Sequence, residues 1–350
     1  MRHRPAPQGG PRGARGASGR AGVARRRARG GRGRSHGGRA RGGHVIARRV
    51  RGPALAATLL AVVLVLPFVV PAVGLGLWRT ATRVRTGATG GAIGVDGETI
   101  AWASVGRGEP VLLVHGLRGE ITVLLPLAAQ LARHGRRVVL VDLPGHGRSA
   151  QPARPLTLAR AAELVVAARE RLGLPADTPL VGHSLGAWTV AWISLARPED
   201  CGDVVLISPP GLPFDPPPYP LLLPRTARDA AAAMPLLFAD PPPAFPPVLH
   251  VAVAREPRAS YELLRSVLTG RYLLDGLVEG ESRRGLVVVG REDRLVPPSI
   301  GRELAARSPR LEYAEIAHAS HMVVWERPRE LAAQVARFLD QPSSGASSGS

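Results

Sequence analysis

Short apolar runs alternate along most of the chain with longer segments of helical periodicity. Val111-Leu112-Leu113-Val114 and Leu286-Val287-Val288-Val289 are typical of strands buried on both faces. Because such strands alternate with helices, the sequence predicts an α/β fold, a mostly parallel sheet with helices on both faces. We expect strands near 99–105, 110–115, 137–142, 178–182, 203–208, 285–290 and 311–316, and helices near 123–134, 158–172, 185–197, 298–307 and 327–339.

The first 51 residues differ in composition from the rest of the chain. They contain 16 of the 46 basic residues and no acidic residue, and they are rich in glycine. Since such a segment cannot bury a core, residues 1–51 are predicted to be a disordered tail. The tail could contact anionic lipid or RNA, or it could precede a true start near Val45 or Val50. The remainder is close to neutral, which argues against nucleic-acid binding by the folded domain.

An uncharged run of 26 residues covers positions 53–78 and predicts a transmembrane helix. A membrane span needs only about 20 residues, and Trp78 followed by Arg79 is typical of a membrane interface. The alternatives are a cleaved secretory signal, which would leave the protein secreted, and a buried helix of a soluble protein. Because arginine is denser before the run, we expect the N-terminus in the cytoplasm and the downstream domain outside it.

The composition changes three more times after this run. Residues 79–92, rich in Thr, Gly and Arg, are interpreted as a linker, and residues 93–340 as the α/β domain. Within the domain, proline clusters interrupt the strand–helix alternation over 209–284, so this segment is predicted to be an insertion at the edge of the sheet. The Ser- and Gly-rich residues 341–350 are predicted to be a disordered tail.

The strongest functional motif is Gly182-His183-Ser184-Leu185-Gly186, which lies between an expected strand and an expected helix. In a nucleophile elbow, a tight strand-to-helix turn exposes the serine hydroxyl, and small residues on either side relieve the crowding. Gly-x-Ser-x-Gly arises by chance in glycine-rich chains. The flanking strand and helix therefore carry the interpretation of Ser184 as a nucleophile.

A serine hydroxyl needs a histidine base within hydrogen-bond reach, and the histidine needs an orienting carboxylate. Asp293 follows the expected strand 285–290, and His321 follows the expected strand 311–316. Both therefore stand at the carboxyl ends of parallel strands, where such sheets bind ligands. We predict Asp293 as the acid and His321 as the base, with Glu292 and His318 as the respective alternatives.

The tetrahedral intermediate of acyl transfer requires backbone N–H donors for its oxyanion. One donor is expected from Leu185, because it directly follows Ser184 at a helix N-terminus, where the dipole favours negative charge. The second is expected from Leu117, in the turn after His115-Gly116.

Five motifs occur in order over about 95–340: His115-Gly116, the segment 142–149, the elbow, the loop 290–297, and His321-Met322 running into Glu326-Arg327-Pro328. In these motifs the chain resembles the α/β-hydrolase fold superfamily, in its esterase, lipase and C–C hydrolase branch. The resemblance implies an eight-stranded type of sheet, a cap formed by 209–284, and loop-shaping roles for His115 and His146. The charges of Leu117-Arg118-Gly119-Glu120 depart from the family pattern, in which small or aromatic residues are frequent at these positions. The resemblance therefore does not predict the chemistry near the mouth of the pocket.

The combined interpretation is a membrane-anchored serine hydrolase that cleaves a carboxylic ester of a small or lipid-like molecule. No metal or organic cofactor is expected, and the single cysteine, Cys201, has no partner for a disulfide or a thiolate metal site. Acyl transfer or C–C bond hydrolysis on the same residues remains an alternative, as does a non-catalytic binding protein of this fold. The sequence predicts no oligomeric state.

Overall fold

The structure, a computed structural model, describes residues 56–58, 60–62, 71–215, 219–241 and 258–341. Eight strands within these ranges form one sheet in the order β1-β2-β4-β3-β5-β6-β7-β8. They are β1 Thr89–Val95, β2 Glu98–Val105, β3 Glu109–Val114, β4 Arg136–Val141, β5 Leu180–His183, β6 Val204–Ile207, β7 Gly285–Gly290 and β8 Leu311–Ile316. β2 runs antiparallel to both neighbours, and all pairs from β4 to β8 are parallel, so the predicted mostly parallel sheet is confirmed.

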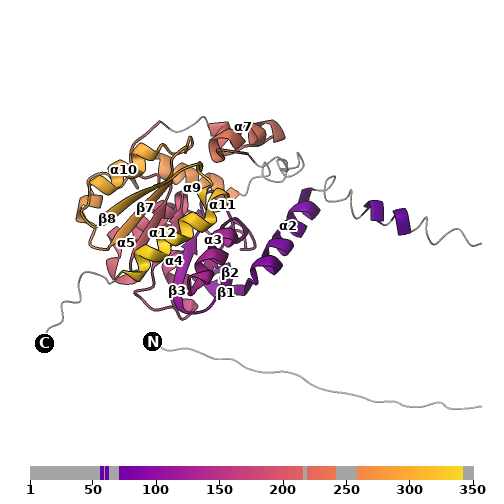
Figure 1. The fold of residues 1–350 in the computed structure, drawn as a ribbon, viewed down its shortest axis with the longest axis horizontal. Helices are drawn as coiled ribbons and strands as arrows, with labels where there is room; N and C mark the ends of the chain where they lie inside the picture. Colours follow the sequence, from indigo (N-terminus) through magenta and orange to yellow (C-terminus); the bar gives the residue numbers. More distant parts are fainter. Residues whose placement is uncertain (1–55, 59, 63–70, 216–218, 242–257, 342–350) are drawn as a thin grey trace, which may run out of the picture. The chain divides into compact units, whose positions relative to one another are not determined.

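Helices cover both faces of this sheet, as predicted (Figure 1). Alternate residues of β3 show the division: Leu112 packs into a core with α4 and α5, while Leu113 packs into a core with α3 and α12. The helices outside the insertion are α2 Pro71–Thr86, α3 Ile121–Arg133, α4 Leu158–Arg171, α5 Leu185–Ala196, α10 Pro298–Ala306, α11 Val323–Glu326 and α12 Pro328–Asp340, with a 3-10 turn at Pro198–Asp200.

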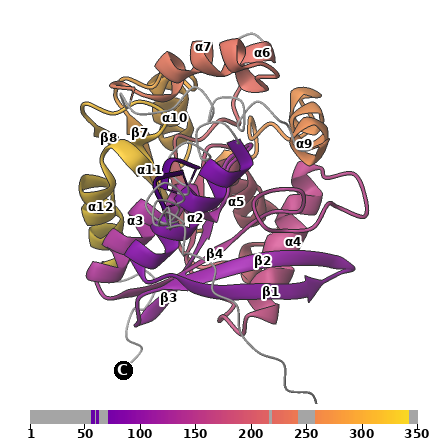
Figure 2. The same ribbon diagram turned by 90° about the vertical axis from the view of Figure 1, so that its right-hand side faces the viewer.

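The segment between β6 and β7, residues 209–284, contains more helix than its prolines indicate. The described elements are α6 Tyr219–Leu222, α7 Ala227–Leu237, α9 Arg258–Leu268 and a 3-10 turn at Val278–Gly280. Helix α7 begins with a capping box, in which Thr226 and Asp229 satisfy each other's backbone amides. Figure 2 shows α6 and α7 beyond one end of the sheet, with α9 beside α4.

The predicted linker at 79–92 is wrong for most of its length. Helix α2 continues to Thr86, and β1 begins at Thr89. Polar residues hold α2 in place, because Arg79 forms an ion pair with Glu120 and Thr82 is buried. The edge strand β1 forms by backbone pairing with β2 and needs no apolar run of its own.

The predicted membrane segment at 53–78 lies only partly within the described residues, since 53–55, 59 and 63–70 fall outside them. Within the described ranges, no helix has both the length and the apolar character needed to cross a bilayer. The tails predicted at 1–51 and 341–350 lie outside the described residues, except for Gln341.

Candidate active site

Ser184 occupies the turn between β5 and α5. Its backbone angles, φ 55° and ψ −121°, are unusual for a residue with a side chain, and its amide donates a 2.8 Å hydrogen bond to the carbonyl of Ile207 on β6. A residue other than glycine keeps such angles only where its surroundings impose them. This is the strained strand-to-helix turn expected of a nucleophile elbow.

Two glycines of the motif allow this turn to form. A Cβ built on Gly182 would lie 2.2 Å from the carbonyl oxygen of Gly186, and one built on Gly186 would lie 2.3 Å from the carbonyl oxygen of Val114. Contacts this short cannot exist without backbone movement. Glycine at both positions therefore lets β5, α5 and the end of β3 pack directly against one another.

Asp293 and His321 are joined by a hydrogen bond of 2.9 Å between Oδ2 of the carboxylate and Nδ1 of the ring, and both side chains are buried. The other carboxylate oxygen accepts the amides of Leu295 and Val296, each at 2.9 Å, which fixes its direction. With Nδ1 engaged by Asp293, Nε2 of His321 is left to exchange a proton with a substrate or nucleophile.

The two alternatives of the sequence analysis lie elsewhere. Glu292 accepts the backbone amide of Ala319 at 3.0 Å, and His318 is exposed in the turn after β8 with φ 56°. Of the two acidic neighbours, the structure thus joins Asp293 to His321.

His183, which precedes the serine, packs against the candidate base. Its Nε2 lies 2.9 Å from the backbone oxygen of His321, and the two ring centroids are 5.1 Å apart. Complete burial lowers the pKa of His183 to about 3, with the neighbouring His321 as the next cause. The ring is therefore neutral at pH 7 and donates a proton from Nε2, which helps to hold the His321 backbone.

The turn after β3 contains Leu117, the second expected oxyanion donor. The amide of Gly119 donates to the carbonyl of Gly116 at 2.9 Å, and Arg118 has φ 59°, as in a turn with a left-handed third residue. A Cβ on Gly116 would lie 2.9 Å from Cβ of Ser184, so Leu117 directly follows a residue packed against the serine. Leu185 is the first residue of α5, where amide groups are free of intrahelical partners.

Buried polar groups hold this turn in place through hydrogen bonds to the backbone. Asp142 accepts the amides of Ile121 at 2.6 Å and Arg148 at 2.9 Å, and its burial raises its pKa to about 6. His115 lies between the amide of Leu143, 3.0 Å from Nε2, and the carbonyl of Gly116, 2.8 Å from Nδ1. The ring must therefore be neutral with its proton on Nδ1, in keeping with a pKa that burial lowers to about 4.

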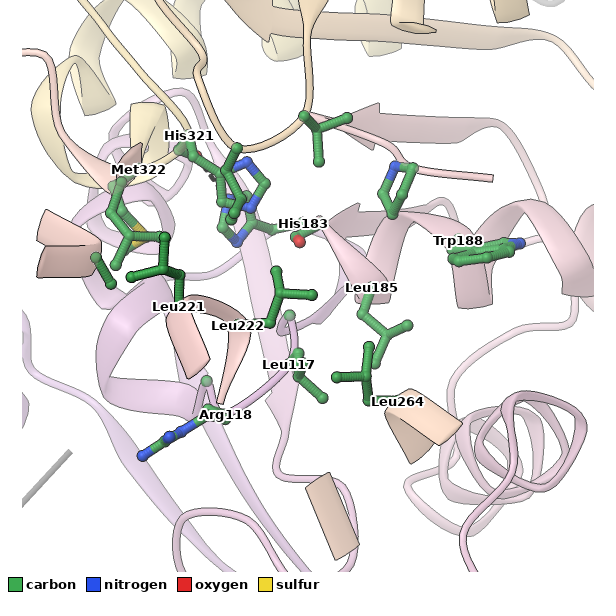
Figure 3. Close-up of a pocket in the computed structure, with 18 of the residues that line it drawn as sticks. Leu117, Arg118, His183, Leu185, Trp188, Leu221, Leu222, Leu264, His321 and Met322 are labelled. Atoms are coloured by element: carbon green, nitrogen blue, oxygen red, sulfur yellow. Dashed lines mark hydrogen bonds between the residues drawn. The ribbon is translucent and has the colours of Figure 1, made fainter. Parts of the chain in front are cut away.

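A cavity of about 540 Å³ contains Ser184 and His321 in its wall. Figure 3 shows Leu117, Leu185, Leu222 and Leu264 converging from four different elements, while the Arg118 side chain extends away from them. None of the described residues that line the cavity is acidic. Sequence reasoning missed most of the aromatic lining, which includes Trp78, Trp188, Phe238 and Trp325.

The insertion is tied to the loop that carries His321. Glu326 accepts the amide of Ser320 at 2.8 Å through one oxygen and the amide of Ala239 at 2.8 Å through the other. The amide of Met322 also donates to the carbonyl of Leu237 at 2.9 Å. The end of α7 and the His321 loop therefore form one hydrogen-bonded unit.

A second tie joins the insertion to the segment after β4. Ser260 on α9 lies 2.7 Å from Nε2 of His146, whose Nδ1 lies 3.0 Å from the carbonyl of Pro144. Burial lowers the pKa of His146 to about 3, so the neutral ring donates from Nδ1 and accepts from the serine hydroxyl.

The chain is similar to known hydrolases and acyl-transfer proteins. The model of the alpha/beta hydrolase family matches residues 111–334. The chain is 29% identical over 262 residues to the dihydrolipoyllysine-residue acetyltransferase component of the acetoin cleaving system of Pseudomonas putida, with 70% of this chain and 68% of that protein covered. It is 28% identical over 259 residues to the pimeloyl-(acyl-carrier protein) methyl ester esterase of Stenotrophomonas maltophilia, with 67% of this chain and 94% of that protein covered. A solved structure of a bacterial membrane phospholipase A matches with a TM-score of 0.71 at 24% identity, covering 82% of this chain and 97% of that one.

Proposed function

Because the chain belongs to the alpha/beta hydrolase family, we propose that it is a serine hydrolase that cleaves carboxylic esters through an acyl-enzyme on Ser184. One observation carries the proposal. A strained serine shares a cavity with His321, whose Nδ1 is hydrogen-bonded to buried Asp293. Similarity to an esterase along 94% of that relative's length supports the choice of ester.

In the first half-reaction, Oγ of Ser184 attacks the acyl carbon while its proton passes to Nε2 of His321. Asp293 orients the ring and stabilises the imidazolium that forms. The negative oxygen of the tetrahedral intermediate accepts the amides of Leu117 and Leu185. When the carbon–oxygen bond to the leaving group breaks, His321 donates the proton to the leaving oxygen, and the alcohol departs.

In the second half-reaction, water attacks the acyl-enzyme and gives its proton to His321. The bond to Ser184 then breaks, the serine regains its proton, and a carboxylic acid is released. Neutral His183 beside the base avoids a second positive charge next to the imidazolium.

Residues 53–78 are proposed to anchor the domain to a membrane, with the N-terminus in the cytoplasm and residues 93–340 outside it. The support is the uncharged run and the excess of arginine ahead of it. Protease added to intact cells or spheroplasts should digest the domain and spare a cytoplasmic marker protein. A domain protected until the cells are lysed would reverse the proposed topology.

The catalytic proposal is tested by labelling the detergent-solubilised full chain with a fluorophosphonate probe and mapping the adduct by mass spectrometry. We expect the adduct on Ser184 and its loss in Ser184→Ala and His321→Ala variants. Ser194→Ala, which removes a buried serine of α5, is the matched control and should label normally. Absence of labelling in the folded wild-type protein would contradict the proposal.

The same acyl-enzyme could transfer its acyl group to an alcohol instead of water. Product analysis with an added primary alcohol separates the two outcomes. Free acid as the dominant product supports hydrolysis, and a new ester as the dominant product indicates an acyltransferase.

A further inference from the structure

Helix α2 forms part of the cavity wall. Its Trp78 lines the cavity and packs edge-to-face on Trp325, with ring centroids 6.3 Å apart. Trp325 makes the same type of contact with Phe238, also at 6.3 Å. A helix that precedes the sheet in sequence therefore joins α11 and the end of α7 in enclosing the cavity.

Polar contacts fix α2 beside the oxyanion turn. Nε of Arg79 donates to Oε1 of Glu120 at 2.8 Å, and a second guanidinium nitrogen pairs with the other carboxylate oxygen. Glu120 is the N-cap residue of α3, three residues after Leu117. A partly buried ion pair with two contacts helps to fix the position of α2 beside α3. The charges of the Leu117–Glu120 segment are thus partly explained, since Glu120 binds α2.

Two large apolar side chains of α2 face solvent. Leu77 is 53% exposed and Val84 is 76% exposed, and because they are seven residues apart they lie on one face of the helix. Leu268, at the end of α9, is 50% exposed and also lines the cavity. Arg85 adds an exposed positive charge to the same helix. We call Leu77, Trp78, Val84 and Leu268 the apolar rim.

The residues of the apolar rim that lie on α2 are continuous in sequence with the uncharged run at 53–78. Trp78 is both the last residue of that run and a residue of the cavity wall. Exposed apolar residues together with arginine on one helix are typical of a segment that lies in a membrane interface. A cavity whose wall includes a residue of such a helix, as Trp78 does here, can receive an apolar chain without its passage through water.

We infer that the apolar rim rests on the membrane and that the cavity takes its substrate from that bilayer, as an acyl ester of a membrane lipid. This inference rests on the proposed serine hydrolase function. The acyl chain would occupy the apolar cavity, and its ester carbonyl would reach Ser184. The exposed Arg85 would favour a bilayer that contains anionic lipid.

The first test compares two substrates with the full chain reconstituted in vesicles of phosphatidylcholine and phosphatidylglycerol. One is a fluorogenic long-chain ester that resides in the vesicles, and the other is a water-soluble p-nitrophenyl ester of a short acid. We expect Leu77→Asp, at an exposed position outside the cavity lining, to lower kcat/KM for the vesicle-resident ester by about tenfold and for the soluble ester by less than about twofold. Leu77→Met, which keeps an apolar side chain there, should retain most of the activity on both esters.

Equal losses with both substrates would overturn the inference and assign Leu77 a structural role. Hydrolysis of the soluble ester alone, by wild-type protein that labels on Ser184, would overturn the inference and leave the proposed function intact. Failure of Ser184 to label would instead remove the proposed function itself.

The second test measures membrane depth without activity. Spin labels are attached at Leu77→Cys and Leu268→Cys, and their accessibility to oxygen and to a water-soluble nickel complex is compared. The native Cys201 is buried and burial raises its pKa to about 11, so it remains unlabelled. Glu199→Cys, exposed in the turn after α5, is the control and should be accessible to nickel. Equal nickel accessibility at all three positions would overturn the inference.

Discussion

Asp293 holds the Nδ1 side of His321 at 2.9 Å while its second carboxylate oxygen accepts two backbone amides. These contacts leave the carboxylate no freedom to rotate. The direction of the His321 ring is therefore set by the backbone of the loop after β7.

Asp293→Asn should abolish most of the activity without unfolding the protein. The amide oxygen can still accept from Leu295 and Val296, but the NH₂ group then faces Nδ1 of His321 and forces the wrong tautomer. We expect kcat for a soluble ester to fall on the order of ten-thousandfold. The melting temperature serves as the check on folding.

Glu292→Gln is the matched control for that substitution. Its remaining oxygen can keep the bond to the amide of Ala319, so kcat should change by less than about threefold. If Glu292→Gln proved as damaging as Asp293→Asn, Asp293 would lose its assignment as the acid.

Gly186→Ala should destabilise the elbow. The new methyl group would meet carbonyl oxygens of Val114 and His115 at 2.3 and 2.6 Å, both of them backbone atoms. We expect a loss of about 2 kcal/mol or more and a clear drop in melting temperature. Gly76→Ala in α2 is the control, because a Cβ there meets nothing within 4 Å, and it should be neutral or slightly stabilising.

Glu326→Ala should weaken both the insertion and the candidate active site. The substitution removes the acceptor for the amides of Ser320 and Ala239, at a cost of about 1–3 kcal/mol for each amide left buried and unsatisfied. Because Ser320 precedes His321, we expect kcat to fall by at least about tenfold. Glu330→Ala, an exposed substitution on α12, should leave kcat and melting temperature unchanged.

Stability should fall as the pH is lowered from 6.5. The pKa of His115 is lowered to about 4, and those of His146 and His183 to about 3, so the unfolded chain binds more protons in this window. Asp142 acts in the opposite direction. Burial raises its pKa to about 6, so its carboxyl group takes up a proton at a higher pH in the folded state than in the unfolded chain. Because three histidines act against one carboxyl group, the net effect of lowering the pH is a smaller free energy of unfolding.

The expected slope is about 1.4 kcal/mol per pH unit for each net proton, measured as the free energy of unfolding between pH 6.5 and 4. A His146→Gln variant, lower in stability at pH 7, should show a shallower slope by about one proton. A slope unchanged by this substitution would mean that His146 does not titrate as its burial indicates.

The positions of the candidate catalytic residues could be predicted because they follow from strand ends. Ser184, Asp293 and His321 each come directly after an apolar run or within a few residues of one, and such runs can be recognised from the sequence alone. The hydrogen-bond partners of Glu292 and His318 could not be predicted, since both competitors stand equally near a strand end. Only the three-dimensional course of each loop distinguishes them.

The edge strand β1 and the second half of helix α2, beyond the helix predicted at 53–78, were missed for a physical reason. β1 contains Gly90, Gly91 and Gly94 and is largely exposed, so it shows neither an apolar run nor an alternation. Helix α2 is stabilised by contacts with distant residues, above all by Glu120. Tertiary contacts of this kind leave no local periodicity in the sequence.

The helices of the insertion did leave signals. The capping box of Thr226 and Asp229 marks the start of α7, and Ala259, Leu263 and Val267 follow the spacing of one helix face in α9. The proline clusters nearby nevertheless favoured the prediction of an irregular insertion over a prediction of helices.

The close approach of Gly116 to Ser184 limits how this protein could acquire new substrates. The turn after β3 and Ser184 are packed so tightly that neither can shift to accommodate a different acyl group. Variation has to occur instead in the side chains of the insertion and of α2, which face the cavity across open space. Laboratory selection for new esters should therefore accumulate substitutions there and leave the elbow and the turn after β3 unaltered.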